Sequence, residues 1–144
     1  MNMKFEPPLY SLDEKWKSGK YNNIIPLRSK LLLDIGGKEV VPNRETMAKE
    51  LINEGEVIDF NSIEVVKGRS NQCHKNSCLL YQQNNCITHI GTGWALSDDD
   101  FWRQHSWAIK NNDTIVETTV PREIYYGICM NDERAEKFIK NMPW

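Results

Sequence analysis

The chain has 144 residues, enough for one domain with a hydrophobic core and too few for two comfortable ones. Its formal net charge of −2 excludes a general affinity for nucleic acid or anionic membrane surfaces. No apolar run approaches the roughly 18 residues of a membrane span, so a membrane-spanning class is excluded as well.

The N-terminal segment Met1–Tyr10 lacks the pattern of a signal peptide, because Lys4, Glu6 and two prolines interrupt it. We therefore expect a cytoplasmic protein whose cysteines are reduced. Apart from Cys73, they are expected to be small buried apolar residues, namely Cys78, Cys86 and Cys129.

Residues 1–68 predict a helical and irregular part without chemistry of its own, packed on the rest of a single domain, 1–144. Ser11 is expected to cap a short helix, and the apolar run 31–35 fits more than one structure. Asn43 is expected to cap a helix over 44–54, with Gly55 as its left-handed C-terminal residue. Residues 56–66 then read as extended chain.

Residues 69–144 predict a catalytic core with a C-terminal helix. A helix of about three turns begins at Cys73 and ends near Asn84. Three strands follow it, the first interrupted by glycines and the second covered on both faces, at 86–96, 101–109 and 114–120. Tyr125–Gly127 reads as an aromatic segment, and 131–141 as a capped helix. The fold class is therefore α+β, with the Cys73 helix packed on an antiparallel sheet.

The candidate chemistry consists of a thiol, an imidazole and a carboxylate that follow one another along the chain: Cys73, His105 and Glu117. A thiol reacts as its thiolate, and a helix N-terminus with a nearby imidazole lowers the pKa of a thiol. Cys73 would attack an acyl carbon, His105 would transfer the proton, and Glu117 would orient the imidazole. Arg103 or Arg122 is the alternative partner of Glu117.

Strand geometry tests whether the imidazole and the carboxylate can meet across the predicted hairpin. A three-residue loop at Lys110–Asn112 places His105 directly opposite Glu117. A three-residue loop at Asn111–Asp113 places Thr119 opposite His105, with Glu117 diagonal and within about 7–8 Å. A two-residue loop separates the pair onto opposite faces. The spacing therefore permits the pair without requiring it.

An oxyanion site is expected at the start of the Cys73 helix, because the first backbone N–H groups of a helix have no intrahelical acceptor. Those of Cys73 and His74 are the candidates, with a side-chain amide from Gln72 or Asn71. Trp107 reads as a core aromatic that is also able to wall a substrate cleft.

These residues carry a resemblance to a known family. The sequence resembles the papain-like cysteine peptidase and amidase superfamily, and is most similar to its transglutaminase-like core, over about residues 69–127. The segments that carry the likeness are Cys73 at a helix start, Gly93-Trp94-Ala95, His105-Ser106-Trp107 and Glu117-Thr118-Thr119. The resemblance implies a Cys73–His105–Glu117 triad, although the acid is Glu rather than the usual Asp, and the segment between nucleophile and histidine is compact.

The sequence thus predicts a hydrolase or acyltransferase that cleaves or transfers an amide, isopeptide or related acyl bond through a thioester on Cys73. Its substrate is expected to be a peptide, a protein or a small amide. No cofactor and no metal are required. One alternative is a zinc site, for which five residues are available: Cys73, His74, Cys78, Cys86 and His89. The other is a catalytically inactive interaction module of the same fold.

Overall fold

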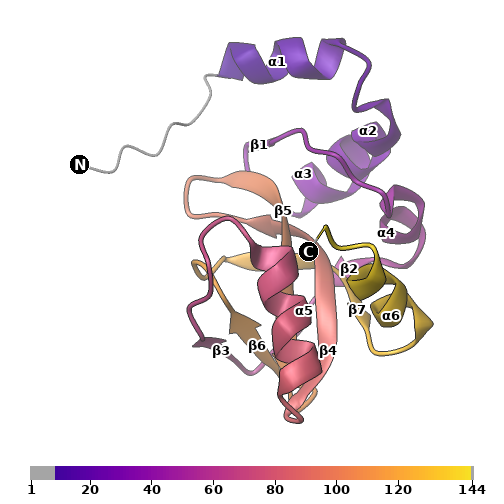
Figure 1. Ribbon diagram of the computed structural model, residues 1–144. Helices are drawn as coiled ribbons and strands as arrows, with labels where there is room; N and C mark the ends of the chain where they lie inside the picture. The colour runs from indigo at the N-terminus through magenta and orange to yellow at the C-terminus, as the bar shows by residue number, and fades with distance from the viewer. Residues whose placement is uncertain (1–8, 144) are drawn as a thin grey trace.

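The computed structural model describes residues 9–143 and builds them around a seven-stranded, mostly antiparallel sheet (Figure 1). The strand order is β2-β7-β4-β5-β6-β3, and β1 pairs with β5 off this path. The strands are β1 (Glu39–Val40), β2 (Glu56–Val57), β3 (Ser62–Val65), β4 (Ile87–Leu96), β5 (Phe101–Lys110), β6 (Thr114–Glu117) and β7 (Ile124–Met130). The predicted α+β class is therefore confirmed.

The helices of the described chain lie before, between and after these strands. They are α1 (Leu9–Lys17), α2 (Ile25–Leu27), α3 (Leu33–Ile35), α4 (Ala48–Glu54), α5 (Cys73–Gln83) and α6 (Glu133–Lys140). A π-helical segment, η2 (Arg28–Leu32), joins α2 to α3, so the apolar run 31–35 is helical. No helix within residues 9–143 is long and apolar enough to cross a membrane. The leader expectation for Met1–Tyr10 rests mainly on residues 1–8, which lie outside the described range.

Two predicted helix starts are wrong. α1 begins at Leu9, so Ser11 lies inside the helix rather than at its cap. α4 begins at Ala48 rather than at 44, because the residues before it hold a buried carboxylate, Glu45. This carboxylate accepts hydrogen bonds from the Trp94 indole (3.1 Å) and the Met47 backbone (3.0 Å), an arrangement that a helix starting at Asn43 would disrupt.

Glycines in the sheet admit bulky neighbours and do not interrupt strands. β4 runs unbroken through Gly91 and Gly93, contrary to the prediction. A Cβ atom on Gly91 would lie 2.0 Å from Nε1 of Trp107, and one on Gly93 would lie 2.2 Å from the backbone oxygen of Tyr126. Gly55 likewise has extended backbone (φ −65°) rather than the predicted left-handed conformation, and its Cβ would meet the Leu51 carbonyl oxygen at 2.4 Å.

The strand β7 was read from sequence only as an aromatic segment. It pairs antiparallel with β4 along its whole length, with Tyr125 opposite Ala95 and Tyr126 opposite Trp94. Because side chains alternate along a strand, the two tyrosines serve opposite faces of the sheet. Tyr126 joins the main core, and Tyr125 faces the other side.

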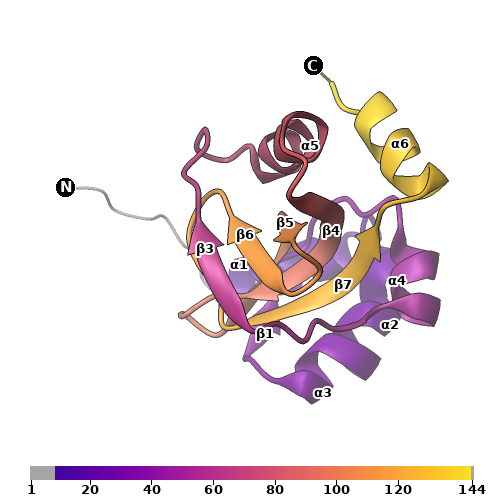
Figure 2. The same ribbon diagram turned by 90° about the horizontal axis from the view of Figure 1, so that it is seen from below.

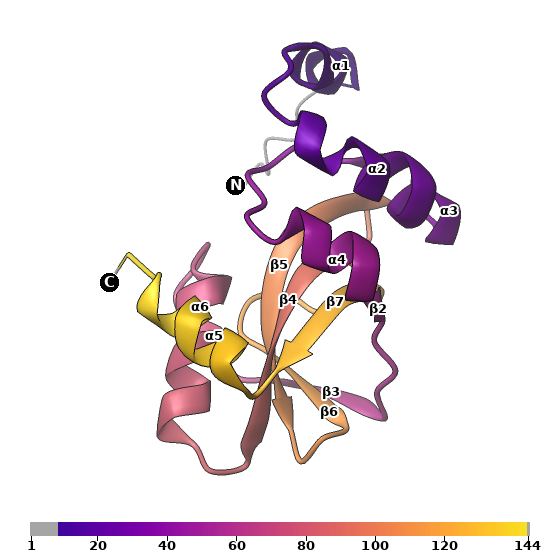
Figure 3. The same cartoon turned by 90° about the vertical axis from the view of Figure 1, so that its right-hand side faces the viewer.

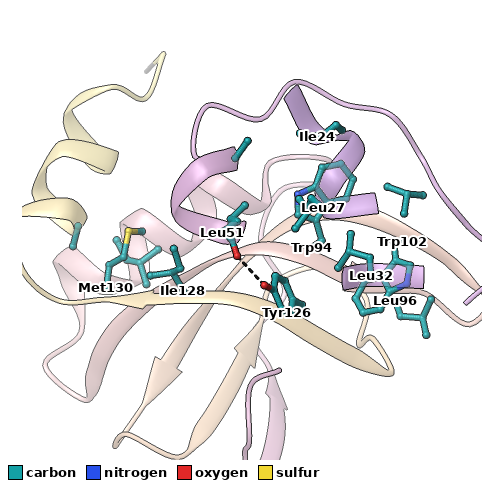
Figure 4. Packing of buried hydrophobic residues seen from close by; sticks show 14 of the residues in the cluster. Ile24, Leu27, Leu32, Leu51, Trp94, Leu96, Trp102, Tyr126, Ile128 and Met130 are labelled. Carbon is teal, nitrogen blue, oxygen red and sulfur yellow. Dashed lines mark hydrogen bonds between the residues drawn. The ribbon is translucent and has the colours of Figure 1, made fainter. Parts of the chain in front are cut away.

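The helices cover one face of the sheet, where the larger core lies (Figures 2 and 3). Leu27 and Leu32 from the N-terminal helices belong to the same cluster as Trp94 and Trp102 (Figure 4). The hydroxyl of Tyr126 donates to the Leu51 carbonyl at 2.7 Å, which ties α4 to β7. The N-terminal part is thus continuous with the core, as expected of one domain.

The opposite face is covered by the strap between β2 and β3. β2 and β3 lie at opposite edges of the sheet, five strand spacings apart, which is about 24 Å in a flat sheet. The five residue steps from Val57 to Ser62 reach only about 17 Å when fully extended. The sheet therefore curls around the strap, with Ile58 and Phe60 packed against its concave face (Figure 2).

The edge of β5 is left open over a short stretch. β1 pairs with Phe101 and Trp102, and β6 pairs with residues 108–110. Between these two partners, residues 103–107 have no strand on that side. We call this stretch the β5 gap, and the candidate site lies in it.

We predict that Gly91→Ala lowers the free energy of unfolding by about 1–3 kcal/mol, because the new methyl group would overlap the Trp107 ring. Gly36→Ala is the matched control, since its Cβ would meet only side-chain atoms at 3.8 Å or more. There the change should be neutral, or stabilising by about 0.4–1 kcal/mol. Equal denaturant midpoints for the two variants would contradict this packing.

Candidate active site

The thiol of Cys73 lies at the first residue of α5, beside the β5 gap. Asn71, two residues earlier, has left-handed backbone (φ 59°) and turns the chain into the helix. The sulfur is hydrogen-bonded to the side chain of His105 and to the backbone of Ser106. Because a thiolate only accepts hydrogen bonds, the Ser106 contribution is its N–H, directed to a side that β6 does not reach.

The imidazole of His105 joins the thiol to Glu117. Its Nε2 lies 2.8 Å from Oε1 and 2.9 Å from Oε2 of Glu117, which leaves Nδ1 for the sulfur. The ring is 2% exposed and packs against Trp107 and Tyr125, with ring centroids 6.1 and 6.2 Å away. The imidazole is therefore fixed by contacts on both its edges and its faces.

The hairpin register agrees with the second of the two predicted alternatives. Its loop is Asn111–Asp113, and Lys110 pairs with Thr114. Glu117 is consequently diagonal to His105, and its longer side chain reaches the imidazole from there. β6 ends at Glu117 rather than at 120, because Thr119 turns back to bind the Glu117 carboxylate.

The Glu117 carboxylate is fully buried and accepts hydrogen bonds from three residues. Besides His105, they are the hydroxyl of Tyr125 (2.7 Å), and the backbone N–H (3.2 Å) and hydroxyl (3.1 Å) of Thr119. A buried carboxylate requires such compensation, since desolvation alone would disfavour its charge. Neither Arg103, which pairs with Asp99, nor Arg122 forms an ion pair with it.

The electrostatics favour a charged thiolate–imidazolium pair. Burial would raise the pKa of Cys73, but the hydrogen bond and positive charge of His105, with the Ser106 N–H, bring it below its ordinary value. Burial would lower the pKa of His105, but its bonds to Cys73 and Glu117 raise it overall. Burial would raise the pKa of Glu117, yet its bond to His105 and its other donors lower it.

The start of α5 offers the expected backbone donors. The Asn76 N–H donates to the Gln72 carbonyl, so the N–H groups of Cys73, His74 and Lys75 have no intrahelical acceptor. The Gln72 side chain makes no capping hydrogen bond, and the side-chain amide that lines the groove belongs to Asn71. Of the two predicted amides, Asn71 is therefore the better placed.

The side chain of His74 is held within the protein. Its Nδ1 is hydrogen-bonded to the hydroxyl of Ser106, which contacts Thr92 at 2.9 Å, and its ring packs on Phe138. Burial lowers the pKa of His74, and the positive charge of His105 lowers it further. The imidazole of His74 thus supports the β5 strand, while its backbone N–H remains the candidate oxyanion donor.

Trp107 was among the candidates for substrate binding, and this expectation is wrong. The residue is fully buried (0% exposed), so it has no surface to offer a substrate. It packs instead against Tyr125, with ring centroids 5.0 Å apart, and against the imidazole of His105. Its place in the site is to hold the histidine ring.

The candidate zinc ligands do not assemble. Within residues 9–143, no three His, Cys, Asp or Glu side chains are grouped so as to hold a metal ion. Cys78 is buried, and burial raises its pKa to about 12. Cys129 is half-buried and its pKa is raised to about 11, whereas Cys86 is exposed, contrary to the prediction.

A polar groove of about 1030 Å³ opens over the site. Cys73 and His105 line it, so solvent and ligands can reach the thiol. Its remaining walls come from segments 67–71, 97–104 and 118–122, together with Asn43. We call it the Cys73 groove.

Comparison with protein-family models, curated proteins and solved structures found no match for this chain. The site is therefore interpreted from its own geometry. Sequence reasoning missed Tyr125, whose phenol reaches Glu117 from β7. Thr119 was visible in the sequence as the last residue of the Glu117-Thr118-Thr119 segment, but was given no role.

We predict that alkylation of Cys73 by iodoacetamide reaches half its maximal rate at a pH below about 8.5, the value for a free thiol. The lowered pKa of Cys73 provides the thiolate at that pH. In His105→Ala the midpoint should rise, because burial remains while the stabilising partner is lost. The measurement is the rate at each pH, with the modified cysteine assigned by peptide mass mapping. A wild-type midpoint at or above that of a free thiol would contradict the ion pair.

Proposed function

We propose that this chain is a cysteine-nucleophile hydrolase or acyltransferase acting on an amide, isopeptide or related acyl bond. One observation carries the proposal: a solvent-reachable thiol is hydrogen-bonded to a buried imidazole that a buried carboxylate holds in place. Perturbed ionisable groups in a groove are typical of catalytic sites.

The reaction begins with attack of the Cys73 thiolate on the acyl carbon. A sulfur–carbon bond forms, and the carbonyl electron pair moves onto oxygen, where the N–H groups of Cys73 and His74 would stabilise it. The carbon–nitrogen bond then breaks, and the leaving amine takes the proton of the His105 imidazolium. This leaves a thioester on Cys73 and a neutral imidazole.

The second half-reaction reverses these roles. Water or an acceptor amine attacks the thioester and gives its proton to His105, and the thiolate leaves. Glu117 keeps its carboxylate on Nε2 throughout, so that Nδ1 stays directed at the sulfur. No cofactor takes part, since the protein supplies nucleophile, base and oxyanion donors.

Three features support an assignment to the papain-like superfamily with a transglutaminase-like core. The nucleophile begins a helix that packs on the sheet, the histidine and the acid lie on adjacent antiparallel strands, and the acid is followed by Thr119, which binds it. The substrate would be a peptide, a protein segment or a small amide, met in the cytoplasm and bound in the Cys73 groove.

We predict that p-nitrophenyl acetate acetylates Cys73 and forms a hydroxylamine-sensitive thioester that intact-mass measurement detects. Cys73→Ala should form none. His105→Ala should slow acylation by about 100-fold or more, because proton transfer and thiolate stabilisation are both lost. Glu117→Gln should slow it by about tenfold, since only the orientation and charge of the imidazole change.

Cys86→Ala is the matched control, because Cys86 is an exposed cysteine outside the groove. Its acetylation rate should equal that of the wild type. Acetylation that persists in Cys73→Ala at the wild-type rate would remove the nucleophile from the proposal.

A further inference from the structure

The Cys73 groove is polar and carries an excess of positive charge. Its side chains are mostly amides and hydroxyls, and only Val120 and Pro121 are apolar. Three basic residues line it, Lys67, Arg103 and Arg122, against one acidic residue, Asp98. A groove of this composition binds polar or anionic groups better than apolar ones.

Arg122 is held rigidly at this wall by neutral acceptors. Its Nε donates to the Val120 carbonyl (2.8 Å), its Nη1 to the Ser97 hydroxyl (3.1 Å) and its Nη2 to the Thr119 hydroxyl (3.4 Å). Its backbone N–H donates to the hydroxyl of Tyr125 at 3.1 Å. The guanidinium is therefore fixed in position before any ligand arrives.

Arg122 differs in this respect from the other half-buried arginines of residues 9–143. Arg28 pairs with Glu39 and Arg103 with Asp99, each at 2.8 Å, and Arg134 pairs with Glu54 at 3.1 Å. No carboxylate within the described range forms an ion pair with Arg122. A half-buried cation is ordinarily paired, so this one has capacity for an anion from outside the chain.

The free donors of Arg122 have the geometry of a carboxylate clamp. A guanidinium has five N–H groups, and the bonds described above use one on each nitrogen. One N–H then remains on each of Nη1 and Nη2. Such a pair matches the two oxygens of a carboxylate, which a charge-assisted bidentate contact binds strongly.

This clamp is coupled in space to the candidate triad. The Thr119 hydroxyl accepts from Arg122 and donates to Glu117, so one side chain bridges the guanidinium and the triad acid. The Glu117 oxygens are already occupied by His105, Tyr125 and Thr119. Glu117 is thus near Arg122 without neutralising it.

We propose that Arg122 binds a carboxylate of the substrate, so that the preferred acyl compound carries a free carboxylate close to the scissile bond. A peptide C-terminus or an acidic residue next to that bond has this chemistry. The inference rests on the proposed function for its place in catalysis, and on the contacts of Arg122 for the clamp itself.

The first experiment compares two probes that differ only in charge, N-chloroacetyl-glycine and N-chloroacetyl-glycinamide. The ratio of their alkylation rates at Cys73 cancels any change in thiol reactivity. In the wild type the carboxylate probe should react about tenfold faster or more, as expected for a charge-assisted contact. Arg122→Gln should bring the ratio near one, and Arg122→Lys should keep a smaller preference.

Arg69→Gln is the matched control. It removes the same charge from an exposed residue that lies beside the groove lining in sequence but outside it. Its ratio should stay within about twofold of the wild type, because exposed charges are screened by salt. An equal loss in Arg69→Gln and Arg122→Gln would replace the clamp by a general field, and would overturn the proposal.

The second experiment separates the clamp from the catalytic proposal. In Cys73→Ala, binding of N-acetylglycine and N-acetylglycinamide is followed by amide chemical shifts, with and without Arg122→Gln. Preference for the carboxylate that depends on Arg122 supports the clamp even if Cys73 reacts with neither probe, a result that would remove only the catalytic role. Equal binding of the two compounds overturns the clamp and leaves the thiol chemistry unaffected.

Discussion

The buried carboxylate of Glu117 is the constraint on which the rest of the site depends. An unpaired charge at a fully buried position would cost several kcal/mol or shift its own pKa until it was neutral. Donors from three separate segments prevent this, and one of them is the His105 imidazole. The demand of the carboxylate for donors thus fixes the imidazole, and the fixed imidazole in turn lowers the pKa of Cys73.

The curvature of the sheet makes this arrangement possible. The short strap under the concave face draws the two edges together, and Tyr125 on β7 thereby reaches Glu117 on β6 across two intervening strands. Gly91 and Ala95 on β4 leave room there for the Trp107 and Tyr125 rings. The β5 gap then admits the start of α5, so the fold brings the thiol to the histidine along an unpaired edge.

Sequence reasoning reached the local chemistry and the hairpin, and missed what depends on distant packing. Strand alternation placed His105 and Glu117 on one face, and the Asn111–Asp113 loop selects the diagonal register among the alternatives left open. Gly91 and Gly93 were misread as breaks, because the neighbours that require them come from other strands. Tyr125 was missed for the same reason: nothing local marks a phenol that reaches across a curled sheet. The likeness to the papain-like superfamily stays a proposal, since no comparison tests it.

The central claim is that Glu117 and Cys73 together keep His105 positively charged, and ¹⁵N NMR of the imidazole nitrogens measures this most directly. At neutral pH the account predicts that both ring nitrogens of His105 carry protons in the wild type. It further predicts that the pKa of His105 falls in Cys73→Ala, where the thiolate is lost, and in Glu117→Gln. A neutral imidazole in the wild type, with a titration that neither substitution moves, would contradict the account.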